Sequence, residues 1–93
     1  MNYKDILRNQ LLSKTNIDFL VNTVLTNFKI SNKAITKCTT IINNYLSKYL
    51  ENINRYPENN NELIEAINYL NKKCYDDFIV YLTTKYPNIK ING

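Results

Sequence analysis

The side chains that could do chemistry in this chain are few, and their types exclude most catalytic mechanisms. The sequence contains no histidine, and its two cysteines, Cys38 and Cys74, lie far apart. Structural zinc sites need four ligands, usually closely spaced cysteines and histidines, so no metal site is predicted. Nucleophilic catalysis usually needs a neighbouring base, most often histidine. We therefore expect no enzyme, no cofactor and no small-molecule substrate.

The acidic residues do not form an obvious catalytic pair either. Glu62 and Glu65 fall in the first turn of a predicted helix, where the helix dipole stabilises negative charge. Asp76 and Asp77 are adjacent, so on a helix they point about 100° apart. The single glycine is Gly93, and no glycine-rich loop is present to cradle a phosphate. These carboxylates are best interpreted as solvated surface charge.

Lysines interleaved with tyrosines are the strongest candidates for binding. The formal net charge is +4 and the isoelectric point is about 9.1, which favours an acidic partner such as nucleic acid. Lysines could contact phosphates while tyrosine rings stack on bases. The candidate nucleic-acid-binding residues are Lys29, Lys33, Lys37, Lys48, Lys72 and Lys73. In the alternative interpretation these lysines are ordinary solvated surface residues. Ile, Lys, Asn and Tyr are abundant and all have AT-rich codons, so coding bias alone would enrich lysine without any role in binding.

The elements that must position these side chains are predicted to be helices. One glycine and two prolines are too few for the many tight turns of an all-β protein. A first strong helical pattern covers residues 15–29. Its apolar positions recur on one face and are Ile17, Leu20, Val21, Val24, Leu25 and Phe28. Ser13, Thr15 and Asn16 are candidate N-caps, and Asp18 suits the first turn.

Two longer helices, residues 31–56 and 60–86, are predicted to form an antiparallel hairpin broken at Pro57. Ser31 would cap the first of them, and Asn59 followed by Glu62 resembles a capping box for the second. A heptad-like seam along the first comprises Ile35, Cys38, Ile42, Tyr45 and Tyr49. The prediction is thus all-α: a small helical bundle built on this hairpin, with the helix over 15–29 packed against it.

The two cysteines fall at similar heights in this hairpin. We predict two small buried residues with free thiols, and a disulfide is the alternative.

The whole chain, residues 1–93, is predicted to be a single helical domain. Residues 1–12 would form a short helix, or an arm that orders only against a partner, and residues 87–93 an extended tail. The polar N-terminus does not resemble a signal peptide, and no apolar run is long enough to span a membrane. We therefore expect an intracellular protein without a membrane partner.

Two stretches, LLSKTNIDFLVNTVL and PENNNELIEAINYLNKKC, carry a resemblance. They resemble small helical proteins encoded by large AT-rich DNA viruses, and the Leu-Ser-x-x-Asn-Ile start is the most specific element. The resemblance implies a virion component or minor capsid element in addition to a place in the host cytoplasm. It assigns no functional residues.

The leading functional hypothesis is a non-enzymatic interaction protein or virion structural protein. The helix over 15–29 is too short to cover the hairpin, and the apolar surface left open favours self-association into a homo-oligomer or docking on a larger protein. Phe19, Tyr69 and Tyr75 are the predicted partner-binding residues. Two alternatives stay open: a small basic protein that binds or condenses nucleic acid, and an inhibitor or immunity-type protein that neutralises a single partner.

Overall fold

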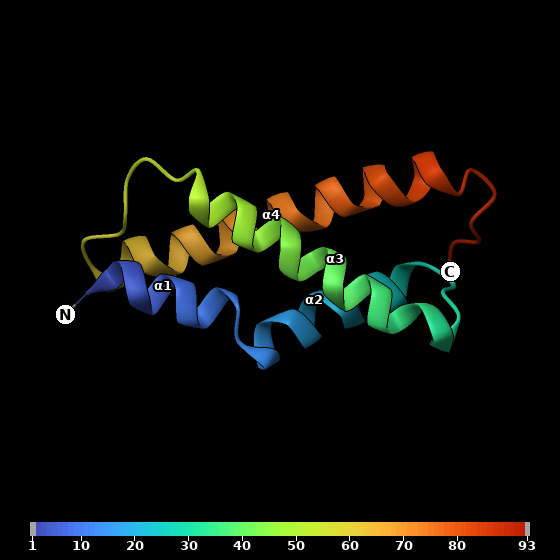
Figure 1. Cartoon of the computed structure of the whole chain (residues 1–93), viewed down its shortest axis with the longest axis horizontal. Helices are drawn as coiled ribbons and strands as arrows, with labels where there is room; N and C mark the ends of the chain where they lie inside the picture. The colour runs from blue at the N-terminus through green and yellow to red at the C-terminus, as the bar shows by residue number, and fades with distance from the viewer. Residues whose placement is uncertain (1, 93) are drawn as a thin grey trace.

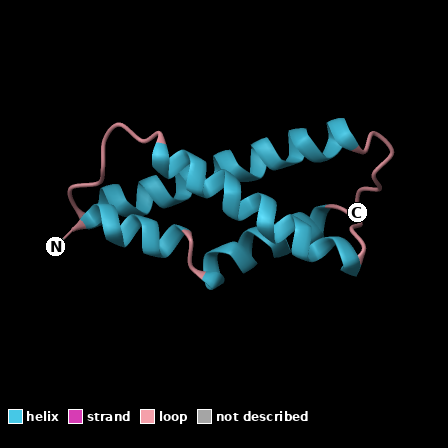
Figure 2. Cartoon of the chain, viewed as in Figure 1, coloured by secondary structure: helices cyan, strands magenta, loops and turns pink. Residues whose placement is uncertain are grey.

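The computed structural model describes residues 2–92 and shows an all-α fold within that range (Figure 2). The helices are α1 (Tyr3–Leu11), α2 (Lys14–Asn27), α3 (Asn32–Glu51) and α4 (Asn60–Lys85). The molecule is elongated, with extents of 45 × 22 × 22 Å. The prediction of a small all-α helical bundle is confirmed. Met1 of the N-terminal segment and Gly93 of the tail lie outside the described residues.

The helices α3 and α4 run antiparallel and cross each other (Figure 1). The shorter α1 packs along the first half of α4, and the hydroxyl of Tyr3 donates a hydrogen bond to Asn60 Oδ1 at 3.2 Å. The helix α2 packs mainly against α3. Both α1 and α2 therefore pack against the hairpin of α3 and α4, whereas the prediction placed only the helix over 15–29 there.

All four helices contribute side chains to one apolar core. Its buried members are Leu7, Leu11, Ile17, Leu20, Val21, Val24, Phe28, Cys38, Ile42, Leu46, Leu50, Leu63, Leu70, Cys74, Phe78 and Leu82. Leu7 and Leu11 of α1 are completely buried. Of the two alternatives for the N-terminal segment, the structure therefore shows the helix packed into the fold rather than an arm.

Ser13 begins α2. Its Oγ accepts a hydrogen bond from the amide of Asn16 at 3.1 Å and donates one to the carbonyl of Gln10 at 2.8 Å. The bond from the Asn16 amide satisfies one of the backbone amides that have no partner at the helix start. Asp18 lies beyond the first turn, contrary to expectation, and forms an exposed ion pair with Lys14 at 2.8 Å.

Asn59 begins α4 as predicted, and its Oδ1 accepts a hydrogen bond from the amide of Glu62 at 2.9 Å. The return bond differs from a standard capping box. The carboxylate of Glu62 accepts from the amide of Glu58 at 2.8 Å and from the guanidinium of Arg55 at 2.9 Å. Ser31 occupies the N-cap position of α3, but its side chain makes no capping hydrogen bond.

The predicted end of α3 at residue 56 is wrong, because the helix ends at Glu51. Asn52 follows it, and the Nδ2 of Asn52 donates to the carbonyl of Lys48 at 2.9 Å. This bond satisfies a carbonyl that has no partner inside the helix. Residues 52–59 then cross to α4 as a loop, in which Pro57 is buried and Ile53 packs against the core.

The predicted heptad seam of α3 is also only partly correct. Ile35, Tyr45 and Tyr49 are half-buried, whereas the buried row has members four residues apart. That row is Cys38, Ile42, Leu46 and Leu50, and α4 faces it with Leu70, Cys74, Phe78 and Leu82. Rows with a spacing of four interdigitate when helices cross at a large angle, whereas a heptad seam suits nearly parallel helices.

Both cysteines are buried and their thiols are free. The Sγ of Cys74 lies 3.8 Å from the carbonyl oxygen of Ile42, one helical turn along α3 from Cys38. The predicted free thiols are thus present in the structure, with Cys74 shifted by about one turn from the height of Cys38.

The C-terminal tail folds back on the segment that joins α2 to α3 (Figure 1). The amide of Lys29 donates to the carbonyl of Lys90, and the amide of Asn92 donates to the carbonyl of Asn27, both at 2.9 Å. Within residues 2–92 this contact, an isolated bridge between Phe28 and Ile91, is the only β-type pairing. The tail closes the end of the bundle at which α3 begins and α4 ends.

Candidate functional site

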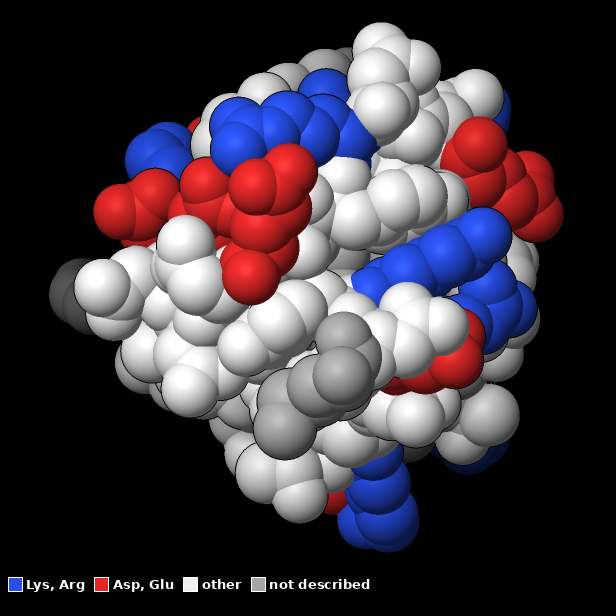
Figure 3. Space-filling model, turned by 90° about the vertical axis from the view of Figure 1, so that its left-hand side faces the viewer, with Lys and Arg blue, Asp and Glu red and all other residues white. Residues whose placement is uncertain are grey.

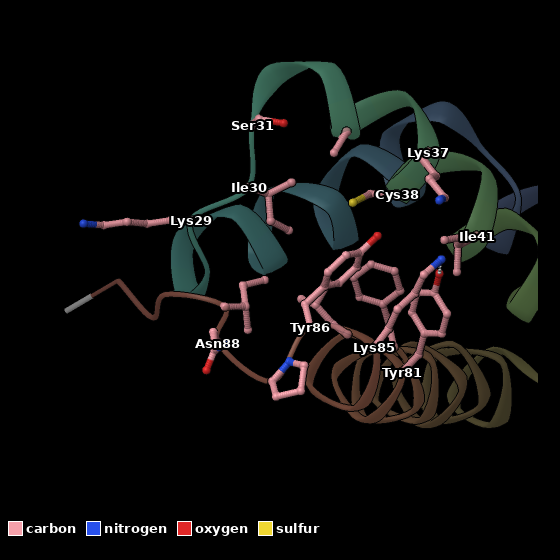
Figure 4. A pocket seen from close by; sticks show the side chains of 15 residues that line it. Lys29, Ile30, Ser31, Lys37, Cys38, Ile41, Tyr81, Lys85, Tyr86 and Asn88 are labelled. Carbon is pink, nitrogen blue, oxygen red and sulfur yellow. Dashed lines mark hydrogen bonds between the residues drawn. The ribbon is translucent and has the colours of Figure 1, made fainter.

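A groove lies between the start of α3, the end of α4 and the tail (Figure 4). Its volume is about 630 Å³, within the range of typical ligand sites. We call it the basic groove. Its lining residues are Lys29, Ile30, Ser31, Ala34, Lys37, Cys38, Ile41, Phe78, Tyr81, Leu82, Lys85, Tyr86, Pro87, Asn88 and Ile89.

The charged residues of the basic groove are all lysines, and no aspartate or glutamate lines it. Lys37 extends from α3 toward Lys85 of α4, so the two ammonium groups approach each other across the groove (Figure 4). Lys85 also donates a hydrogen bond to the hydroxyl of Tyr81 at 3.2 Å and lies 5.7 Å from the ring centre of Tyr86. Lys29 lies at the tail end and points away from the groove.

The floor of the basic groove is apolar and belongs to the core. Cys38, Phe78 and Leu82 present their buried side chains to it. Burial raises the pKa of the Cys38 thiol, so the thiol stays neutral near pH 7. A neutral buried thiol is a poor nucleophile. The floor therefore offers apolar contact rather than covalent chemistry.

The lysines predicted to bind nucleic acid fall into separate groups. Lys29 and Lys37 both line the basic groove. Lys33 precedes Lys37 by four residues on α3, and Lys48 follows Lys37 by about three turns, so these three lie on one side of the helix.

Lys72 and Lys73 of α4 are engaged with carboxylates. Lys72 forms an exposed ion pair with Asp76 at 2.8 Å, and Lys73 lies 3.9 Å from Asp77. Asp77 also accepts a hydrogen bond from the hydroxyl of Tyr49. Burial and this bond raise the pKa of the Tyr49 hydroxyl, so it remains a proton donor. This surface is close to neutral, which distinguishes it from the basic groove.

The predicted partner-binding residues also separate in the structure. Phe19 is 59% exposed on α2 and lines a hollow with Ile67 of α4. Tyr69 is 67% exposed and lines a different hollow with Tyr56. Tyr75 was expected to be exposed, and this was wrong: it packs against the core.

Tyr75 is held in place by an amide of α2. Its hydroxyl accepts a hydrogen bond from Asn27 Nδ2 at 2.8 Å. A second polar link joins the same helices, because Asn16 and Asn71 exchange hydrogen bonds at 2.9 and 2.8 Å. Asn16, one of the candidate caps, therefore ties α2 to α4 instead of capping α2.

Sequence reasoning missed the basic groove as a unit. Lys85 and Tyr86, which line it, were not among the residues predicted to bind nucleic acid or a protein partner. The fold-back of the tail, which brings Ile89 to the groove, has no local signal in the sequence.

The opposite end of the molecule has a mixed charge pattern. Acidic and basic side chains lie next to one another on the surface around the loop between α3 and α4 (Figure 3). The ion pair of Arg55 with Glu62 belongs to this region. An all-lysine lining is therefore a feature of the basic groove and not of the surface in general.

Two further findings concern the part of the chain that the structure describes. No group of three or more His, Cys, Asp or Glu side chains within residues 2–92 is placed to hold a metal ion. No helix in the same range has both the length and the apolar character to cross a membrane.

The buried thiol of Cys74 makes stability depend on pH. Burial raises its pKa from 9.0 to about 12. The unfolded chain loses this proton above pH 9 while the folded chain keeps it, so the unfolded state is favoured as pH rises. We expect the free energy of unfolding in urea to fall between pH 8 and pH 10.5 and to fall less in Cys74→Ala. Equal losses in both proteins would contradict the assignment.

Two proteins of Acanthamoeba polyphaga mimivirus, both described as uncharacterized, are similar to this chain. One is 60% identical over 91 residues and the other 33% identical over 87 residues. The alignments cover 98% and 94% of this chain, but only 15% and 18% of the relatives. The chain thus spans less than a fifth of the length of either relative. No family model matches the chain, and no solved structure does. The relatives support an origin in a large DNA virus, as the resemblance implied.

Proposed function

We propose that the chain is a non-enzymatic helical interaction module that self-associates or docks on a larger protein, with a virion role as its setting. The observation that carries the proposal is an apolar surface formed by the exposed Phe19 and Ile64 with the half-buried Ile67, which we call the Phe19 surface. Phe19 and Ile67 line one hollow, and Ile64 lies one turn before Ile67 on α4.

The exposure of the Phe19 surface supports the proposal. Phe19 is 59% and Ile64 57% exposed, and neither is needed to complete the core of α1 to α4. Adjacent exposed apolar side chains commonly mark protein contact sites, and buried aromatic anchors contribute most of the binding energy. The relatives add support, since a segment like this chain occurs within longer viral proteins.

Phe19→Glu tests self-association through this surface. We expect sedimentation equilibrium of the wild-type chain to give a mass that rises above 11.0 kDa with concentration. The charge in Phe19→Glu would have to be buried in the contact, so the association should weaken by at least about tenfold. Val80→Glu is the matched control, because Val80 is 65% exposed and lines a different hollow with Tyr45. Equal weakening in both variants would contradict a role for the Phe19 surface.

Nucleic-acid binding is the second candidate, and the three lysines on one side of α3 favour it. Lys33, Lys37 and Lys48 form no ion pair within residues 2–92. This candidate predicts binding of a random DNA duplex that weakens steeply with salt and weakens further when these lysines are replaced. Fluorescence anisotropy at low and near-physiological salt measures it. An inhibitor of a single protein would instead form a stoichiometric complex with one non-self partner.

A further inference from the structure

We propose that the basic groove binds an acidic amphipathic peptide segment of a partner protein, with apolar side chains on the groove floor and carboxylates at the lysines. This surface differs from the Phe19 surface. The inference therefore goes beyond self-association and does not depend on it.

The apolar floor is the first argument. Ile30, Ile41 and Ile89 lie partly exposed around the buried Cys38 and Phe78. The volume of the groove, about 630 Å³, is large enough to accept several apolar side chains. Covering this surface would remove apolar area from water, which favours association.

Charge is the second argument. Lys37 and Lys85 direct two like charges toward each other across the groove. A carboxylate placed between these two lysines would be attracted by both ammonium groups. Asp77 lies with Lys85 in a neighbouring hollow, but it already accepts the Tyr49 hydroxyl and faces Lys73. The groove itself supplies no carboxylate to balance its lysines.

The arrangement favours a peptide over other anions. Two lysines face the groove from separate helices, Lys37 from α3 and Lys85 from α4. A fatty acid carries one carboxylate and would use only one of these positions. Nucleic acid would use the lysines and an exposed ring such as Tyr86, but its phosphates gain nothing from the apolar floor. An acidic peptide with apolar residues complements both parts.

The test measures binding of a fluorescein-labelled synthetic peptide, in which central leucines are flanked on both sides by glutamates, to the full chain. We expect saturable binding by fluorescence anisotropy that weakens with salt. A peptide with glutamine in place of glutamate and one with serine in place of leucine should each bind at least about tenfold more weakly. Amide signals of Ala34, Cys38 and Ile89 should shift in NMR spectra on addition of the peptide, because these residues line the groove.

The matched variants locate the site. The double variant Lys37→Glu/Lys85→Glu should weaken binding by at least about tenfold, because it replaces attraction by repulsion. Lys48→Glu, an exposed lysine of α3 outside the groove, should change it less than about twofold. Phe19→Glu should leave peptide binding unchanged even if it abolishes self-association.

Four results would overturn the inference. They are no saturable binding of the acidic peptide, equal binding of its glutamine counterpart, equal loss in Lys48→Glu, and displacement of the peptide by a DNA duplex at lower concentration than by unlabelled peptide. The last result would assign the groove to nucleic acid instead.

Discussion

Phe78→Ala is expected to lower the free energy of unfolding by about 3–5 kcal/mol, as measured by urea denaturation followed by circular dichroism. Phe78 is 1% exposed on α4, where it lies in the core and underlies the basic groove. Its removal leaves a cavity in addition to the lost apolar burial. A small domain has only about 5–15 kcal/mol of stability, so the variant should be largely destabilised.

Val80→Ala is the control for this prediction. Val80 lies on the same helix two residues later, but its side chain is 65% exposed. We expect its effect to stay within about 0.5 kcal/mol, the usual range for exposed positions. Similar losses for Phe78→Ala and Val80→Ala would mean that the core beneath the basic groove is not packed as described.

Leu7→Ala is expected to lower the free energy of unfolding by about 2–5 kcal/mol. Leu7 is completely buried, although it lies in the first short helix of the chain. The same urea titration measures the effect, and Gln10→Ala, at an exposed position of α1, provides the control. If Leu7→Ala behaved like Gln10→Ala, α1 would be an arm on the surface rather than part of the core.

The sequence predicted the elements that are determined locally. Apolar positions at helical spacing identified α2, whose N-cap Ser13 was one of three candidates, and Asn59 marked the start of α4. A cap acts through hydrogen bonds within a few residues, so its signal lies entirely in the local sequence. The polar residues that precede Ile17 are thus explained mainly as the beginning of a helix.

Features that depend on how one helix of the chain packs against another were predicted less well. The apolar residues of α3 were compatible with more than one buried row, and its crossing with α4 selects the row from Cys38 to Leu50. Tyr75 looked like an exposed aromatic because its bond to Asn27 joins residues distant in sequence.

The basic groove depends on contacts that the sequence could not reveal. Lys37 and Lys85 are far apart along the chain, and they meet only because α3 and α4 are antiparallel. The tail adds Ile89 through backbone hydrogen bonds to the segment before α3, and these bonds are independent of side-chain type. Charge count alone indicated a basic protein but not where its lysines gather.

Site-specific photo-cross-linking tests the proposed interaction module most directly. A photoreactive amino acid replaces Phe19 in one sample and Val80 in another, and each purified protein is irradiated alone and in an extract of cells that produce it. The account predicts a discrete adduct from position 19, with a second copy or one larger protein, and little from position 80. No adduct from position 19, or the same adducts from both positions, would contradict the claim that the Phe19 surface contacts another protein.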